Sequence, residues 1–146
     1  MSNRTLIKNA IVVNEGSVFP SDVLIVNNRI EQVAESISAK GNESIVDASG
    51  LHLLPGMIDD QVHFREPGLT HKGNIASESR AAVAGGITSF MEMPNVNPST
   101  TTIEALEKKF DIAKENSVAN YSFYLGATEE NIEEIKRLDP TKHCGV

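Results

Sequence analysis

The chain has 146 residues, of which 40% are hydrophobic and 23% are charged, a composition that suits a packed domain and argues against disorder. Its formal net charge of −7 has the wrong sign for binding a phosphate backbone, and the single cysteine, Cys144, excludes an internal disulfide. No apolar run reaches the roughly 18 residues of a membrane span, and the N-terminus lacks a signal-peptide pattern. We therefore expect a cytoplasmic protein with neither nucleic-acid nor membrane partners.

Before Pro55 the sequence predicts short strands joined by tight turns. Five stretches rich in apolar and β-branched residues are separated by Asn, Gly and Ser: residues 6–13, 22–26, 29–33, 44–47 and 51–54. Asn14-Glu15-Gly16 and Asn27-Asn28 suit tight turns because Asn and Gly tolerate positive φ. A sheet of this size is marginal by itself, so we expect it to pack against another part of the protein.

After Pro55 strands and helices alternate. We predict strands at residues 57–64, 87–93 and 120–125, helices at 74–84, from 103 and at 129–138, and the start of a fourth strand at 144–146. Gly85-Gly86 suit a left-handed helix end, and Thr101 and Glu104 have the spacing of a capping box. The pair Lys108-Lys109 and the acidic residues 129–134 are expected on solvated helix faces. Such alternation predicts a parallel sheet with right-handed crossovers.

Two folds contain such a sheet, the open doubly wound sheet and the (β/α)₈ barrel. No Gly-x-Gly-x-x-Gly follows the first strand, which removes the main support for a nucleotide-binding doubly wound sheet. The polar residues His63, Arg65 and Asn95 instead follow the carboxyl ends of strands, where barrel enzymes build their sites. A complete barrel needs about 250 residues, so residues 56–146 account for only part of one.

The stretch from Asp59 to Gly68 has the highest density of side chains that could bind a metal ion or a substrate. On a strand, residues 59, 61 and 63 point to one face and could converge on a metal ion. By residue type alone, however, a single histidine after a strand is more often structural than a ligand. Arg65 is equally consistent with a surface ion pair, so the residues alone leave both roles open.

Four motifs resemble the N-terminal part of dihydroorotases, which belong to the amidohydrolase superfamily. The motifs are Leu54-Pro55-Gly56-Met57-Ile58-Asp59, then x-Gln61-x-His63-x-Arg65-Glu66-Pro67-Gly68, Ala84-Gly85-Gly86-Ile87-Thr88 and Met93-Pro94-Asn95, and the resemblance covers essentially the whole chain. The resemblance implies an α/β fold in which residues 1–55 form a small β-sandwich segment. Residues 56–146 would be the first three βα units and the start of the fourth strand of a (β/α)₈ TIM barrel. The chain would then be the N-terminal part of a longer parent.

The resemblance also implies roles for individual residues. His63 matches the second ligand of a His-x-His pair on Zn²⁺, of which the parent would hold one or two ions. Arg65 and Asn95 match residues that hold the substrate's carboxylate, which a guanidinium fork and an amide N–H suit chemically. Asp59 matches an aspartate with a supporting role behind the metal ligands.

The sequence departs from the family in two ways. Gln61 replaces the first histidine, and an amide oxygen is a weaker ligand for Zn²⁺, so we expect one metal site to be weakened, altered or lost. The family's metal-bridging lysine, later histidines and general-base aspartate would lie beyond Val146. We therefore expect no catalytic residue within this chain, and no activity from these 146 residues alone.

The leading functional hypothesis is a dihydroorotase-like zinc hydrolase that interconverts N-carbamoyl-aspartate and dihydroorotate in pyrimidine synthesis. One alternative is a non-catalytic scaffold for aspartate transcarbamoylase, which Gln61 favours and the retained Arg65 and Asn95 oppose. Another is a related cyclic amidase such as an allantoinase or dihydropyrimidinase. The expected partners are a small substrate bearing a carboxylate and either further copies of the chain or aspartate transcarbamoylase. The other histidines, His52, His71 and His143, are expected to be structural or solvated.

Overall fold

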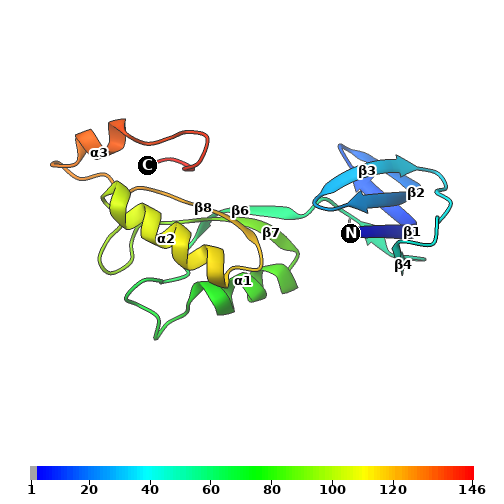
Figure 1. Cartoon of the computed structure of the whole chain (residues 1–146), viewed down its shortest axis with the longest axis horizontal. Helices are drawn as coiled ribbons and strands as arrows, with labels where there is room; N and C mark the ends of the chain where they lie inside the picture. Colours follow the sequence, from blue (N-terminus) through cyan, green and yellow to red (C-terminus); the bar gives the residue numbers. More distant parts are fainter. Residues whose placement is uncertain (1–2) are drawn as a thin grey trace. The chain divides into compact units, whose positions relative to one another are not determined.

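The computed structural model describes residues 3–146, which divide into two compact units, Met1–Pro55 and Gly56–Val146 (Figure 1). Among the described residues, no helix is long and apolar enough to cross a membrane.

The first unit is one five-stranded sheet. Three strands form antiparallel hairpins, β1 (Arg4–Asn14), β2 (Ser17–Val26) and β3 (Arg29–Ala34), while β4 (Ser44–Asp47) and β5 (His52–Leu53) pair with β1 in parallel. The predicted turns are confirmed, because Glu15, Gly16 and Asn27 have φ of 48°, 76° and 55°. All five predicted strands are present, and the fifth is shortened to two residues.

The buried side chain of Asp22 connects β2 to β1 and to the segment after β3 through hydrogen bonds. A bulge in β1 between Ile7 and Ala10 puts Asn9 at φ 61°. The Asp22 carboxylate is 2% exposed and accepts hydrogen bonds from Lys8 Nζ at 2.7 Å and from the backbone N–H groups of Asn9 and Ile37, both at 2.8 Å. Burial raises the pKa of Asp22, but these hydrogen bonds and the Lys8 charge outweigh it and lower the pKa to about 2.

The second unit is built on a parallel sheet in the order β6-β7-β8, as predicted. Its strands are β6 (Met57–Val62), β7 (Ile87–Glu92) and β8 (Asn120–Phe123), connected by the helices α1 (Ile75–Ala84) and α2 (Ile103–Asn116). A short helix, α3 (Ile132–Lys136), follows β8. The predicted fourth strand is represented by a single parallel bridge between Tyr124 and Gly145. The mixed α/β class is thereby confirmed.

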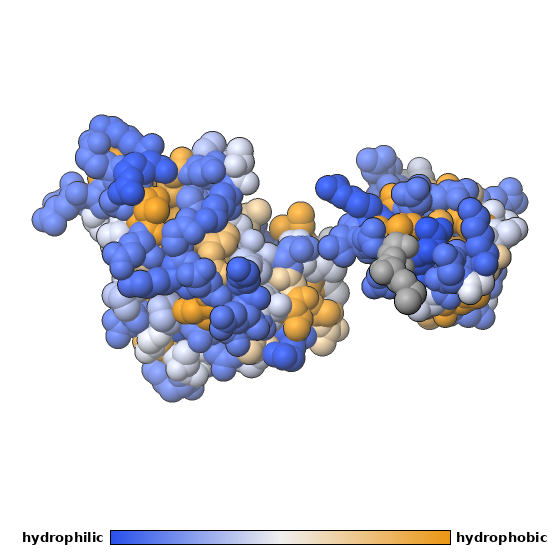
Figure 2. Space-filling view, viewed as in Figure 1, coloured by the Kyte–Doolittle hydropathy of each residue, from blue (hydrophilic) through white to orange (hydrophobic). Residues whose placement is uncertain are grey.

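The core of this unit lies between the sheet and its helices, with α1 and α2 on the same side of the strands (Figure 1). The Phe64 and Phe90 rings lie 4.5 Å apart, and Phe110 packs edge-on against Phe123 at 5.0 Å. Each buried aromatic side chain contributes roughly 1.5–3 kcal/mol through removal from water. Apolar surface remains exposed at Met57, Ile58 and Val83, and Figure 2 shows apolar surface on this unit near β6 and β7.

Two details of the helix ends differ from the prediction and one agrees with it. The N-cap of α2 is Thr102 rather than Thr101, since its side chain accepts from the backbone N–H of Ala105, and Glu104 pairs with Lys108 instead of completing a capping box. Helix α3 is five residues long, because the side chain of Asn131 ties the preceding loop to Thr101 and Gly126. After α1, the left-handed end predicted at Gly85-Gly86 is confirmed at Gly86, with φ of 90°.

Candidate functional site

The predicted site residues lie at the carboxyl ends of β6 and β7. Val62 and Phe64 are buried in the core beside the helices, while Gln61 and His63 are exposed, as strand alternation predicts for opposite faces of β6. The end of β7 leads through Met93 and Pro94 to Asn95. Parallel strands bring these two ends to the same edge of the sheet.

The structure joins His63 and Asn95 directly. His63 Nδ1 lies 2.9 Å from Asn95 Oδ1. Because an amide oxygen can only accept, this contact requires the proton on Nδ1 and leaves the Nε2 lone pair free. It also leaves the Asn95 amide N–H groups free to donate to another group. A metal-ligand role for His63 and an anion-binding role for Asn95 are therefore compatible with each other.

Arg65 has an unusual backbone. Its φ of 72° lies in the left-handed region, which disfavours side chains with a Cβ and costs on the order of 1 kcal/mol or more. Within residues 3–146 the Arg65 guanidinium forms no ion pair, so the surface ion-pair alternative has no partner there. Strained residues of this kind are concentrated at binding sites.

The rest of the Arg-Glu-Pro-Gly motif connects loops. Glu66 accepts a hydrogen bond from the backbone N–H of Ile75 at 2.9 Å and so caps the start of α1. Pro67 O accepts from Asn97 N at 3.1 Å. Gly68, with φ of 81°, packs so closely that a Cβ would lie 1.8 Å from Asn97 O. These contacts tie the loop after β6 to the loop after β7.

Asp59 and Gln61 do not join His63 in a closed metal site. Asp59 Oδ1 accepts from the backbone N–H of Gln61 at 3.1 Å. Among residues 3–146, no group of three or more His, Cys, Asp or Glu side chains could hold a metal ion. A tetrahedral zinc site needs about four ligands. His63 Nε2 and the Gln61 amide oxygen can supply at most two of them, so the described residues do not complete such a site.

A cavity of about 280 Å³ adjoins the ends of all three strands, lined by Asp60, Gln61, Met93, Tyr124 and Val146. The Tyr124 hydroxyl donates to Asp60 O at 3.2 Å, and burial raises its pKa. The sequence prediction did not include Tyr124. It could have been found from its position, because Tyr124 directly follows β8 as His63 directly follows β6.

A larger cavity of about 490 Å³ lies at the start of α2. Its lining includes Pro67, Pro98, Thr101 and Lys108, and none of the predicted site residues.

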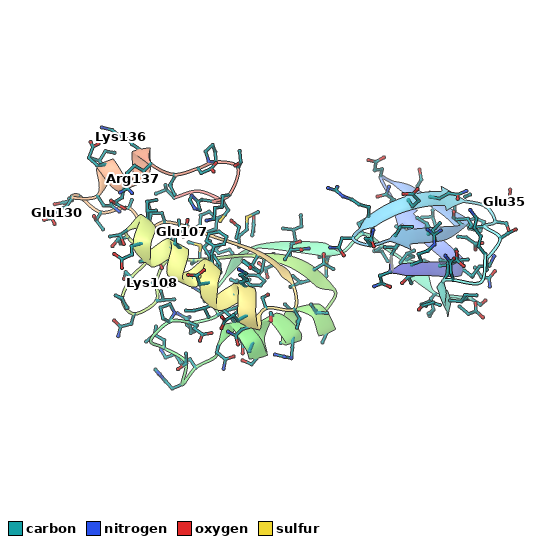
Figure 3. All side chains as sticks on the ribbon, in the orientation of Figure 1. Glu35, Glu107, Lys108, Glu130, Lys136 and Arg137 are labelled. Atoms are coloured by element: carbon teal, nitrogen blue, oxygen red, sulfur yellow. The ribbon has the colours of Figure 1, made fainter. Side chains whose placement is uncertain are left out.

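The prediction was wrong about Lys109. Figure 3 labels its neighbours Glu107 and Lys108 on α2, and Lys108 pairs with Glu104 in solvent. The Lys109 side chain, in contrast, is 0% exposed, and its Nζ lies 2.9 Å from Oε2 of the equally buried Glu92. Burial raises the pKa of Glu92 and lowers that of Lys109, and each charge opposes the shift of its partner. Glu134, also expected in solvent, instead accepts from the backbone N–H of Ile103 at 2.6 Å.

Comparison with known protein families identifies the family of this chain. A family model described as "Dihydro-orotase-like" matches residues 50–146. The chain belongs to this family. It is 36% identical over 132 residues to a dihydroorotase of Methanosarcina acetivorans, covering 90% of the chain and 28% of that relative.

Further relatives carry the names dihydroorotase and allantoinase. The chain is 41% identical over 143 residues to a dihydroorotase of Pediococcus pentosaceus, covering 92% of the chain and 32% of that relative. Over 147 residues it is 35% identical to an allantoinase of Deinococcus radiodurans, covering 100% of the chain and 32% of that relative. The chain thus spans about a third of the length of these relatives.

Solved structures give the same fold. The L-hydantoinase (dihydropyrimidinase) of Arthrobacter aurescens matches with a TM-score of 0.90 and 26% identity over 99% of this chain and 32% of its own. The named relatives are thus all cyclic amide hydrolases.

Proposed function

We propose that this chain forms the N-terminal part of a dihydroorotase-like metal-dependent hydrolase, which interconverts N-carbamoyl-aspartate and dihydroorotate in pyrimidine synthesis. The observation that carries the proposal is the 2.9 Å contact of His63 Nδ1 with Asn95 Oδ1. It places the proposed metal ligand beside the proposed carboxylate-binding amide. Arg65, two residues after His63, supplies the positive charge.

The three side chains would have different roles, set by their chemistry. The Arg65 guanidinium can donate two parallel hydrogen bonds to a substrate carboxylate, and the Asn95 amide can donate a third. These bonds would orient the ring so that one amide carbonyl faces His63. The sheet β6-β7-β8 would form the first part of a barrel. The rest of that barrel would come from the part of a family member that this chain does not cover, which is more than two thirds of its length.

His63 Nε2, and more weakly Gln61, would help to hold a zinc ion whose remaining ligands lie outside residues 3–146. When bound, such a metal supplies an activated water and polarises the ring carbonyl. The residues of this chain bind and orient the substrate.

Two other functions remain in competition. The allantoinase of Deinococcus radiodurans matches over the whole chain at 35% identity, which supports a related cyclic amidase with a different ring as substrate. A scaffold role beside aspartate transcarbamoylase rests on Gln61 alone, and Arg65 and Asn95 have no use in it.

The test is made on the full-length natural protein that contains this chain. We expect it to hydrolyse dihydroorotate faster than allantoin or hydantoin, and we expect Arg65→Ala to raise the KM for dihydroorotate sharply. A preference for allantoin would support the related amidase. No hydrolysis of any ring, with zinc present, would support the scaffold.

A further inference from the structure

A fully buried ion pair lies beneath the proposed site. Glu92 is the last residue of β7 and Lys109 belongs to α2. Their charged atoms are 2.9 Å apart, and both side chains are 0% exposed. Neither residue faces the cavities, so the pair cannot act on a substrate directly.

The pair contacts the ends of β7 and β8 directly and is linked to the end of β6 through Met93. Lys109 Nζ donates to Met93 O at 3.1 Å and lies 4.8 Å from the ring centroid of Phe123 on β8. Met93 N in turn donates to Val62 O, at the end of β6, at 3.0 Å. Lys109 therefore holds the peptide that leads from β7 to Asn95.

Glu92 is paired in register with Val62, the last residue of β6, directly before the segment His63–Arg65. Burial raises the pKa of Glu92, and the backbone N–H groups of Phe64 and Arg65 oppose this shift by favouring the charged form, although neither carboxylate oxygen accepts a hydrogen bond from them. The carboxylate thus acts on this segment mainly through its charge. The segment includes Arg65 in its left-handed conformation, a backbone state that the surroundings must enforce.

Stability alone does not account for this pair. Replacing a buried ion pair by apolar residues of similar volume is often neutral or stabilising, because desolvation of the charges offsets their attraction. The incomplete hydrogen bonding of Glu92 increases that cost. Two apolar side chains could neither place a negative charge that favours the N–H groups of Phe64 and Arg65 nor donate a hydrogen bond to Met93 O.

We propose that Glu92 and Lys109 are positioning residues, which set the backbone of Phe64–Arg65 and of Met93 and thereby direct Arg65 and Asn95 at the substrate carboxylate. This inference rests on the proposed function of Arg65 and Asn95 as the carboxylate-binding residues. Neither member of the pair touches substrate.

The decisive variant is E92Q/K109M in the full-length protein, which removes both charges and leaves no unpaired one in the core. We expect its melting temperature to stay close to that of the wild type. We expect its KM for dihydroorotate to rise about tenfold or more, with a smaller change in kcat, because small misplacements of binding groups are costly. An unchanged KM would overturn the inference. Should this variant fail to fold, E92Q/K109Q, whose two amides can bond to each other, replaces it.

A matched control comes from the first unit. The pair Lys8–Asp22 also joins a buried carboxylate to a lysine, at 2.7 Å. The variant K8M/D22N should lower stability and leave the KM unchanged. An equal rise in KM in this control would show that any loss of a buried pair raises it, and would also overturn the inference.

One readout does not depend on activity. In E92Q/K109M, hydrogen exchange at the Phe64 and Arg65 amides should accelerate relative to amides at the start of β6. If the wild type fails to hydrolyse dihydroorotate, the proposed function is wrong, and faster exchange still supports the positioning of the backbone. Unchanged exchange contradicts the positioning role whatever the substrate is.

Discussion

His63 and Asn95, which are 32 residues apart in the sequence, are joined by a contact of 2.9 Å between Nδ1 and Oδ1. The contact couples two properties that would otherwise be independent, the tautomer of a potential metal ligand and the orientation of a potential anion-binding amide. A change at Asn95 should therefore be visible at both.

Asn95→Asp separates the two roles. A carboxylate oxygen still accepts from His63 Nδ1, so we expect the zinc content of the full-length protein to be retained. The added negative charge would repel a substrate carboxylate, so the KM for dihydroorotate should rise strongly. Asn95→Ala removes the acceptor and should weaken metal binding by about 10- to 100-fold, measured by competition with a chelator.

Asn120→Ala is the control for these variants. Asn120 lies at the start of β8, the opposite end of the sheet, where its amide donates to Thr88 O at 3.2 Å. Loss of zinc from this variant equal to that from Asn95→Ala would show that the His63–Asn95 contact has no specific effect on the metal.

Gln61→His should strengthen metal binding. Gln61 and His63 are both exposed on the face of β6 opposite the helices, and an imidazole is a better ligand for Zn²⁺ than an amide oxygen. We expect the full-length variant to retain zinc at chelator concentrations that strip the wild type. Gln32→His, on exposed β3, is the matched control and should change nothing. Equal retention by wild type and Gln61→His would mean that residue 61 is not a ligand.

Gly68→Ala should destabilise the loops around the site. A Cβ at this position would lie 1.8 Å from Asn97 O and would also occupy a backbone with φ of 81°. We expect a loss of about 2 kcal/mol or more in the free energy of unfolding, measured in urea. Gly50→Ala has a similar φ of 76° but open space around it, so it should lose only about 1 kcal/mol. Equal losses would mean that the Asn97 contact is not rigid.

Asp22 should make the first sheet sensitive to acid. Its pKa is lowered from 3.8 to about 2, so the charged carboxylate stabilises the fold above about pH 4, and this contribution is lost as the pH falls towards 2. Protection of the Asn9 and Ile37 amides, its two backbone donors, against hydrogen exchange should fall over that range in the wild type, relative to the intrinsic exchange rate at each pH. In Asp22→Asn this protection should be lower already at neutral pH and should change less with acid. Parallel pH profiles would contradict this role.

Local sequence patterns determined most of the elements of this protein. Strand alternation predicted that residues 61 and 63 share one face, and both are exposed while the intervening Val62 and the following Phe64 are buried, because the side-chain period of a strand is a local property. Turn residues such as Gly16 and Asn27 likewise specify their own backbone. The family could also be recognised from short motifs, since those motifs combine turn, cap and site residues in a fixed order.

Only the tertiary structure decided how residues distant in sequence meet. Lys109 follows Lys108 on a helix and looks equally solvated in sequence, yet packing of α2 on β8 buries it against Glu92. Asn131 belongs to a helix by pattern, but its hydrogen bonds to Thr101 and Gly126 shorten α3. The hydrogen bond between His63 and Asn95 also arises from the pairing of β6 with β7. Each depends on burial and contact across elements, and these are set by the packed chain as a whole rather than by neighbouring residues.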